Sequence, residues 1–251
     1  MNATIQKYEE LSLNSFPALQ TQLYDGWVLR FANGFNNRAN SVSLLHESTL
    51  DWETKVCECE KRYAAQGLPT VFKVTDAAET GFDCMLEEQG YEVVTPTNFM
   101  VMNMHDKEFA VGSHILENHA SEEWLNAYFL LSKYDSNANK MYVSRQIAVN
   151  TKSPAVYAQL EKGGKPVACG SSVIELGHMA LLNITVDENN RRKGYGYELC
   201  QLLLAAAKGM GAHTAYLQVE QANQTAVNLY TKLGYKKVYT YWYRVKKQGG
   251  I

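Results

Sequence analysis

The chain has 251 residues, which is enough for one large domain or two small ones. Apolar residues make up 46% of it and charged residues 20%, which excludes the composition typical of a disordered protein. Because 24 basic residues stand against 26 acidic ones, with a formal net charge of -2, a general attraction to nucleic acid or to an anionic membrane is not expected.

No apolar stretch reaches the roughly 18 residues needed to cross a bilayer. The N-terminal sequence MNATIQKYEE also lacks the basic and apolar regions of a signal peptide. We therefore expect a cytoplasmic protein. The five cysteines are odd in number and fall in expected helices or strands, which favours reduced thiols. Cys57 and Cys59 would point about 200 degrees apart on a helix, so no metal site is expected.

The first half of the chain predicts alternating strands and helices. The segments 26–31 and 40–45 have the composition of a β-hairpin, and Asn33-Gly34 between them is a turn signal. Helices are predicted where apolar residues recur at intervals of three or four and a glycine follows. The further elements predicted for this half are a helix at 52–65, a strand at 71–74, a helix at 79–89 and a strand at 91–104.

A polar segment at 105–119 interrupts both periodicities, and we place a domain boundary within it, between residues 112 and 113. The two expected domains are 1–112 and 113–251. The elements predicted after the boundary are helices at 121–134 and 141–149, hairpin strands at 156–160 and 167–175, a strand at 181–186, a helix at 194–208, a strand at 214–219, a helix at 223–233 and a strand at 237–245.

The two halves correspond without gaps over a strand–helix–strand unit. Thr70 aligns with Thr214, Gly90 with Gly234 and Tyr91 with Tyr235, so that each helix ends at a glycine before the next strand begins. The pattern predicts a degenerate internal duplication.

The segment after Val186 carries the strongest chemical signal. A strand is followed by the basic, glycine-rich run Arg191 to Gly196 and then by a long helix. The first N–H groups of a helix have no partner within it and its dipole favours an anion there, so this loop can bind a diphosphate. Glycine at 194 and 196 would let the anion approach the backbone. The run fits neither a Rossmann motif nor a P-loop, and the alternative is a solvated basic helix cap.

Two motifs together resemble the GNAT acetyltransferase superfamily. The run from Val186 through Arg191-x-x-Gly194-x-Gly196 is similar to that superfamily's coenzyme A loop. The run Asn223-x-x-Ala226-x-x-Leu229-Tyr230-x-x-Leu233-Gly234-Tyr235 resembles the helix that follows it. The resemblance implies an α/β fold with a mixed, mostly antiparallel sheet that is splayed in its middle. With the duplication, it implies a tandem of two GNAT-like domains.

The resemblance also implies roles for individual residues, with acetyl-CoA as the acyl donor. Ile184, Thr185 and Val186 would bind the pantetheine arm along a free strand edge. The diphosphate would lie on the residues of the loop, namely Arg191, Arg192, Lys193, Gly194, Tyr195 and Gly196. Asn223 would position the arm or the adjoining loop. Tyr230 would protonate the departing thiolate, although a tyrosine at a half-buried helix position is more often a packing residue.

The general base has no clear candidate. Several relatives carry a glutamate where this chain has Gln218, which cannot act as a base. Glu220 would point to the same face of a regular strand and is the first substitute, and Glu175 is the second. Either carboxylate could equally be a solvated strand-end residue. An oxyanion donor is expected from a backbone N–H near Val186.

The first half lacks the motifs. Leu86 stands where Tyr230 stands in the second half, Glu79 replaces Asn223, and no basic glycine-rich loop precedes Val71, so no CoA site is expected there. Arg30 and Arg38 suggest selection of a carboxylated substrate, and the alternative is a hairpin that only packs.

These features predict an N-acetyltransferase that moves an acetyl group directly from acetyl-CoA to a primary amine, without a metal. Direct transfer is preferred because Cys169-Gly170-Ser171 lacks the frame of an activated nucleophile. The alternative is a CoA-binding regulatory module without turnover, and a longer acyl-CoA is a further possibility. The acceptor would be a small-molecule or peptide amine. Its identity and the oligomeric state have no signature in the sequence.

Overall fold

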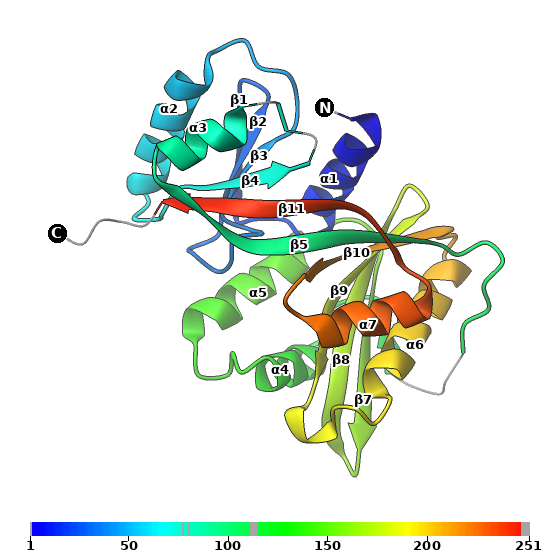
Figure 1. Ribbon diagram of the computed structural model, residues 1–251. Helices are drawn as coiled ribbons and strands as arrows, with labels where there is room; N and C mark the ends of the chain where they lie inside the picture. The colour runs from blue at the N-terminus through cyan, green and yellow to red at the C-terminus, as the bar shows by residue number, and fades with distance from the viewer. Residues whose placement is uncertain (1, 77, 80, 111–114, 247–251) are drawn as a thin grey trace. The chain divides into compact units, whose positions relative to one another are not determined.

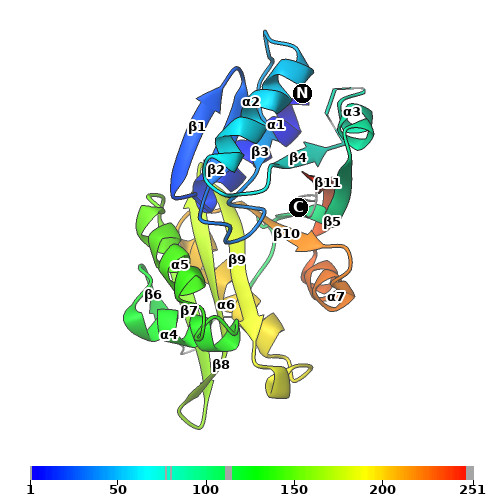
Figure 2. The same cartoon turned by 90° about the vertical axis from the view of Figure 1, so that its left-hand side faces the viewer.

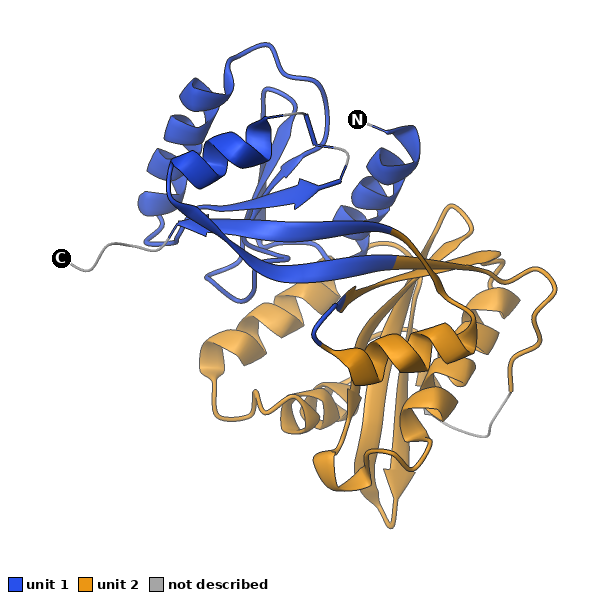
Figure 3. Ribbon diagram, viewed as in Figure 1, with its two compact units in different colours: residues 1–99, 220–222, 239–251 blue, residues 100–219, 223–238 orange. Residues whose placement is uncertain are grey.

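The computed structural model describes residues 2–76, 78–79, 81–110 and 115–246 (Figure 1). The chain forms two compact units (Figure 3): unit 1 comprises residues 1–99, 220–222 and 239–251, and unit 2 comprises 100–219 and 223–238. The boundary expected between 112 and 113 lies outside the described residues. The two compact units meet at four points along the chain, after residues 99, 219, 222 and 238. Three of these points lie within strands β5, β10 and β11.

Unit 1 is a sheet with three helices. Its strands run in the order β1-β2-β3-β4-β11, and neighbours are antiparallel except β3 and β4, which are parallel. The elements of the first half are α1 (Ala3–Ser15), β1 (Gln20–Tyr24), β2 (Trp27–Phe31), β3 (Val42–Leu44), α2 (Trp52–Ala64), β4 (Val71–Thr75), α3 (Phe82–Glu88) and β5 (Tyr91–Asn103).

The beginning of the chain differs from the sequence-based expectation. Helix α1, capped by the side chain of Asn2, and strand β1 were not predicted. The tight hairpin turn is Asp25-Gly26 between β1 and β2, and the predicted turn at Asn33-Gly34 lies in a longer connection between β2 and β3. The antiparallel pairing of β2 with β3 is confirmed.

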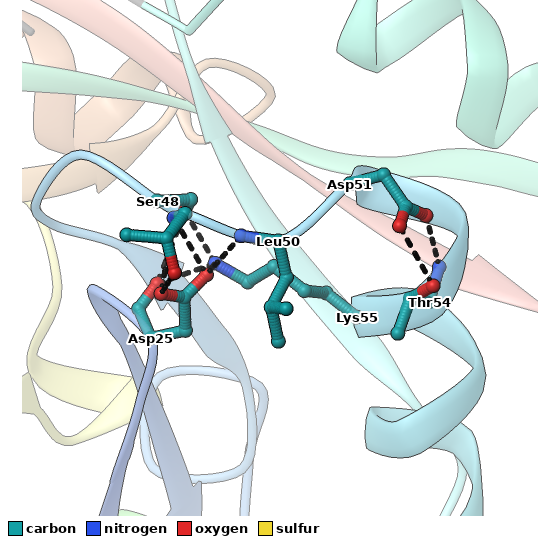
Figure 4. A network of polar contacts seen from close by, with 7 residues as sticks. Asp25, Ser48, Leu50, Asp51, Thr54 and Lys55 are labelled. Atoms are coloured by element: carbon teal, nitrogen blue, oxygen red, sulfur yellow. Dashed lines mark hydrogen bonds and ion pairs between the residues drawn. The ribbon is translucent and has the colours of Figure 1, made fainter.

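A polar network fixes the Asp25 turn (Figure 4). The Asp25 carboxylate accepts hydrogen bonds from the backbone N–H of Leu50 at 2.9 Å and of Thr49 at 3.0 Å, which hold its pKa well below the usual range. The buried Lys55 ammonium lies 3.2 Å from the same carboxylate and also donates to Ser48. Asp51 caps α2 by accepting from the Thr54 N–H at 2.8 Å. Burying a lysine is tolerated here because its charge is paired.

Unit 2 contains the long helix α6 and most of the second half of the chain. The elements of the second half are β6 (Ile115–Glu117), α4 (Glu122–Leu131), α5 (Ala138–Asn150), β7 (Ala155–Lys162), β8 (Lys165–Glu175), β9 (His178–Val186), the 3-10 turn η1 (Glu188–Asn190), α6 (Tyr195–Gly209), β10 (Thr214–Glu220), α7 (Gln224–Leu233) and β11 (Lys236–Lys246). Most of β11 belongs to unit 1. Strands β6 to β9 are antiparallel neighbours, and β9 pairs with β10 in parallel. The mixed, mostly antiparallel sheet is thereby confirmed.

Helices cover both faces of the β7–β9 sheet. Helix α6 packs on one face, and α4 and α5 lie on the other (Figure 2). The α6 face is apolar because Leu199, Leu203 and Ala207 recur at helical spacing and bury themselves against Leu181 of β9 and Val156 of β7. On the α4 face, the Trp124 indole N–H donates to the carbonyl of Ala158 at 3.1 Å. Strands β7 to β9, the last of which carries part of the groove described below, are therefore packed on both faces.

The two halves of the chain have exchanged their last strands. Helix α3 and strand β5 in the first half correspond to α7 and β11 in the second, as the internal alignment predicts. Residues Tyr241–Val245 of β11 nevertheless pair with β4 in unit 1. Conversely, Met100, Met102 and Met104, at and just beyond the end of β5, are buried in the core of unit 2. Each unit therefore contains chain from both halves.

Within the described part of the chain, no helix is both long and apolar enough to cross a membrane.

A fragment of residues 113–251 is expected not to unfold cooperatively on heating. It lacks Met100, Met102 and Met104, and burial of one such side chain contributes roughly 1.5–3 kcal/mol, against a total stability of about 5–15 kcal/mol. It also lacks the backbone bond from Met104 N–H to the His213 carbonyl. A fragment of residues 100–251 restores these contacts and is expected to regain a transition by calorimetry. Equal, sharp transitions in both fragments would contradict the exchange.

Candidate active site

The end of β9 leads through a loop into the N-terminus of α6. After Val186 the chain passes through η1 and enters α6 at Gly194, which takes the N-cap position with φ +92° and supplies no capping side chain. The first N–H groups of α6 therefore receive no hydrogen bond from the side chain of the N-cap residue. Any side chain at Gly194 would be strained in this left-handed conformation. The helix N-terminus is thus prepared for an anion.

The three cations of the loop have different surroundings. The Lys193 ammonium donates to the carbonyl of Asn189 at 2.8 Å and to the side-chain oxygen of Asn190 at 3.2 Å, so it fastens the loop to η1. Arg191 lies 3.8 Å from Glu188. Arg192 is exposed and has a φ of +60°, which an arginine adopts only at some conformational cost.

A groove of about 510 Å³ runs from this loop to α7. It contains every predicted cofactor-binding residue except Lys193, together with the predicted proton donor Tyr230. Its lining residues are Ile184, Thr185, Val186, Asn190, Arg191, Arg192, Gly194, Tyr195, Gly196, Tyr197, Asn223, Thr225, Ala226, Leu229 and Tyr230.

Five lining residues were missed by the sequence analysis: Asn190, Tyr197, Thr225, Ala226 and Leu229. Three of them could have been found, because 225, 226, 229 and 230 share one face of a helix that already carried a predicted residue. Asn190 and Tyr197 had no signal of their own beyond their nearness to the loop.

Asn223 begins α7. Its side-chain oxygen accepts the Ala226 N–H at 3.2 Å, which is the N-cap bond that the α7 sequence needs. The same residue lines the groove, so one asparagine both starts the helix and faces the site. The N-cap bond is by itself a sufficient reason for an asparagine at this position.

Tyr230 lies in the groove wall and is 9% exposed. Its ring packs edge-on against Tyr235, with 6.0 Å between the centroids. Burial raises the pKa of the Tyr235 phenol well above its ordinary value, so Tyr235 is neutral across the physiological range. Of these two phenols, Tyr230 is the one that lines the groove.

The two candidate bases, Glu220 and Glu175, lie at the ends of different strands, β10 and β8. Glu220 is the last residue of β10 and its side chain is exposed, and residues 220–222 belong to unit 1. Glu175 pairs with His178 at the start of β9, whereas the groove lies at the end of that strand. Six to eight residues of strand separate them, or roughly 20–26 Å. The structure therefore does not bring Glu175 to the groove.

Two residues of the first half that the sequence analysis singled out, Leu86 and Arg30, are buried inside unit 1. Leu86 is fully buried in the unit 1 core, so α3 offers no counterpart of Tyr230. The buried Arg30 guanidinium donates to the carbonyls of Phe16 and Arg38. The suggestion that Arg30 selects a carboxylated substrate is therefore wrong, because its donors are already used by the fold.

No buried thiol of unit 2 is suited to nucleophilic catalysis. Cys169 and Cys200 are buried, and burial raises the pKa of each thiol to about 12. Only the thiolate is nucleophilic, and it is scarce at neutral pH under these conditions. Among the described residues, no cluster of three His, Cys, Asp or Glu side chains is placed to hold a metal ion.

The mixed, mostly antiparallel sheet, the helix N-terminus without a capping side chain and the groove beside it are the features expected of the GNAT superfamily, whose members are acyl-CoA-dependent N-acyltransferases. A model of the family described as "Probable histone acetyltransferase Rv0428c C-terminal" matches residues 2–244, and the chain belongs to that family.

Individual relatives agree with this assignment. The chain is 28% identical to the "Uncharacterized N-acetyltransferase YobR" of Bacillus subtilis, over 97% of this chain and 99% of that protein. Its fold is similar to a GCN5-related N-acetyltransferase from Kribbella flavida, with a TM-score of 0.67, 17% identity, and coverage of 99% of this chain and 96% of that one. A tandem GNAT protein from the clavulanic acid biosynthesis pathway gives a TM-score of 0.58 at 12% identity, over 84% of this chain and 76% of that one.

Two of the five cysteines are expected to react quickly with a disulfide reagent at pH 8. Cys57 and Cys84 are exposed, whereas burial raises the pKa of Cys59, Cys169 and Cys200 to about 12 and keeps them as thiols. Titration of the native protein checks this count. The remaining three should react only after unfolding, and a double serine variant at positions 57 and 84 should lose the fast phase. A third fast thiol in the native protein would contradict the burial.

Proposed function

We propose that this protein transfers an acetyl group from acetyl-CoA directly to a primary amine. The observation that carries the proposal is that one groove joins the uncapped N-terminus of α6 to the Tyr230 phenol. An acyl-CoA has a diphosphate at one end of its arm and the thioester sulfur at the other. The α6 N-terminus would bind the diphosphate, and the Tyr230 phenol would face the sulfur.

The diphosphate is proposed to lie on the loop from Arg191 to Gly196. Backbone N–H groups at the start of α6 would donate to it, and the guanidinium groups of Arg191 and Arg192 would add charge. Lys193 is proposed to act indirectly, because its ammonium already holds Asn189 and Asn190 in place. The arm would then follow Ile184, Thr185 and Val186 towards Tyr230.

The proposed reaction needs two proton transfers. The neutral amine attacks the thioester carbonyl, the new carbon–nitrogen bond forms and the carbon–sulfur bond breaks. Tyr230 gives its proton to the departing thiolate. A reference phenol has a pKa of about 10 and a thiol about 8.5, so this transfer is slightly uphill but feasible within a hydrogen bond. The proton that the amine releases is proposed to pass to water. Glu220, the base favoured by the sequence, is not among the residues that line the groove and would take part only through water.

The first half of the chain is proposed to be a copy of the second that has lost its CoA site. The matched order of strand, helix and strand supports a common origin for residues 1–112 and 113–251. The burial of Leu86 at the position equivalent to Tyr230 supports the loss.

Acetyl-CoA turnover across a panel of amines tests the proposal. Thiol release should depend on an added amine from one class among small amines, amino acids, peptide N-termini and protein lysines. Tight binding of acetyl-CoA with no transfer to any amine would instead favour a regulatory module that binds CoA without turnover.

Replacing Tyr230 by phenylalanine is expected to lower kcat by about 10²-fold or more, since general acid catalysis typically contributes 10² to 10⁴. KM for acetyl-CoA should change little, because the ring that lines the groove is kept. Steady-state kinetics with the best amine of the panel provide the measurement. A Tyr235→Phe variant, which changes the neighbouring phenol outside the groove, is the matched control. Unchanged kcat in Tyr230→Phe would remove Tyr230 from the reaction.

Replacing Gly194 by aspartate is expected to abolish acetyl-CoA binding in calorimetry. The substitution strains the backbone and places a negative charge where the diphosphate is proposed to lie. Gly211 is a matched control, because it follows the other end of α6 with a φ of +89°, close to the +92° of Gly194, and a Cβ meets no atom within 4 Å at either position. Gly211→Asp should bind normally, and equal loss in both variants would show that the effect is only structural.

A further inference from the structure

Strand β9 carries one residue more than its neighbour β8 near the groove. Ser171 of β8 pairs with Leu182, and the next paired residue of β8, Cys169, pairs with Thr185. One residue of β8 therefore faces two residues of β9. Such a β-bulge bends the strand and interrupts its pairing.

The bulge changes which face the following side chains occupy. Before it, Leu181 packs into the core under α6. After it, Ile184 and Val186 pack against that same core, although a regular strand would turn positions 184 and 186 to the opposite face. The Thr185 hydroxyl accordingly lies on the α4 side, 3.5 Å from the Ser132 hydroxyl. The extra residue thus decides how all three residues of the groove's strand wall are oriented.

Asn183 adopts the unusual backbone conformation that the bulge requires. Its φ is +57°, in the left-handed region that asparagine tolerates better than most residues. Its side-chain N–H donates to the hydroxyl of Ser171 at 3.0 Å, and Ser171 is buried, at 2% exposure. The Thr185 hydroxyl donates back to the Asn183 carbonyl at 3.3 Å. These bonds fasten the bulged residue to both strands.

Gly170, opposite the bulge, completes the arrangement. A Cβ at this position would lie 2.5 Å from Cδ1 of Ile184 and 3.2 Å from Cδ2 of Leu199. The missing side chain leaves the space in which Ile184 crosses β8 to reach α6. The Gly170 carbonyl also accepts from the Trp124 indole N–H at 3.2 Å, which ties this point of β8 to α4.

We propose that Asn183 is a positioning residue for the acyl-CoA arm, acting by holding the bulge through Ser171. The inference rests on the proposed function, since it assigns the arm to residues 184–186. Asn183 is not among the residues that line the groove, and it acts by setting the orientation of Ile184, Thr185 and Val186. The loop that would hold the diphosphate lies beyond the bulge and does not depend on the bond to Ser171.

The test compares two ligands in the intact protein: acetyl-CoA, which has the arm, and ADP, which has the diphosphate without it. Asn183→Val removes the amide and disfavours the left-handed backbone. It is expected to weaken acetyl-CoA binding about tenfold, or about 1.4 kcal/mol, and to leave ADP binding unchanged. Asn183→Gly accepts the backbone conformation and should recover acetyl-CoA affinity to within about threefold of the unmodified protein. Calorimetry with acetyl-CoA and NMR titration with ADP give the affinities.

Asn33→Val is the matched control, because Asn33 has a φ of +50° in an exposed turn of unit 1. It should lower thermal stability as Asn183→Val does, with no change in acetyl-CoA affinity. Ser171→Ala keeps Asn183 but removes the hydroxyl that accepts its hydrogen bond. This second variant should also weaken acetyl-CoA binding and leave ADP binding unchanged.

Three results would overturn the inference: unchanged acetyl-CoA affinity in Asn183→Val, equal losses for acetyl-CoA and ADP, or no recovery in Asn183→Gly. If the unmodified protein binds no acetyl-CoA, the proposed function fails first, and the role of Asn183 fails with it. If the unmodified protein binds acetyl-CoA and the Asn183 variants bind it equally well, only the role of Asn183 is overturned.

Discussion

The candidate site of unit 2 is built on the N-terminus of α6, where the N-cap residue Gly194 supplies no capping side chain. A helix that begins with serine or aspartate covers some of its first N–H groups with its own side chain, but Gly194 covers none. Its φ of +92° turns the chain sharply from η1 into the helix. Lys193 then holds η1 to the loop, and the groove opens directly in front of the donors. One glycine therefore sets both the direction of the chain and the electrostatic character of the site.

The rest of unit 2 keeps that helix end in a fixed place. The leucines of α6 are buried against β7 and β9, and α4 secures the opposite face through the Trp124 indole. Met100 and Met102 of β5, with Met104 just beyond it, complete this core, so the end of the first half contributes to the stability of the unit that carries the groove. The exchanged strands thus link the core of each unit to both halves of the chain.

Features that depend on local sequence were predicted well. Glycine-terminated helices, the basic loop and the face of α7 follow from neighbouring residues, and they located most of the groove. Features that depend on distant pairing were missed. The position of β11 beside β4 and the bulge at Asn183 arise from contacts between strands, for which alternation along one strand carries no signal. Arg30 was misjudged for the same reason, because its charge is visible in the sequence and its carbonyl partners are not.

The most direct test of the account is a crystal structure of the protein with acetyl-CoA bound. Diphosphate oxygens are expected to accept from backbone N–H groups at Gly194 to Gly196, with the thioester sulfur within hydrogen-bonding distance of the Tyr230 hydroxyl. A diphosphate bound away from the N-terminus of α6, or a sulfur that does not approach Tyr230, would contradict it.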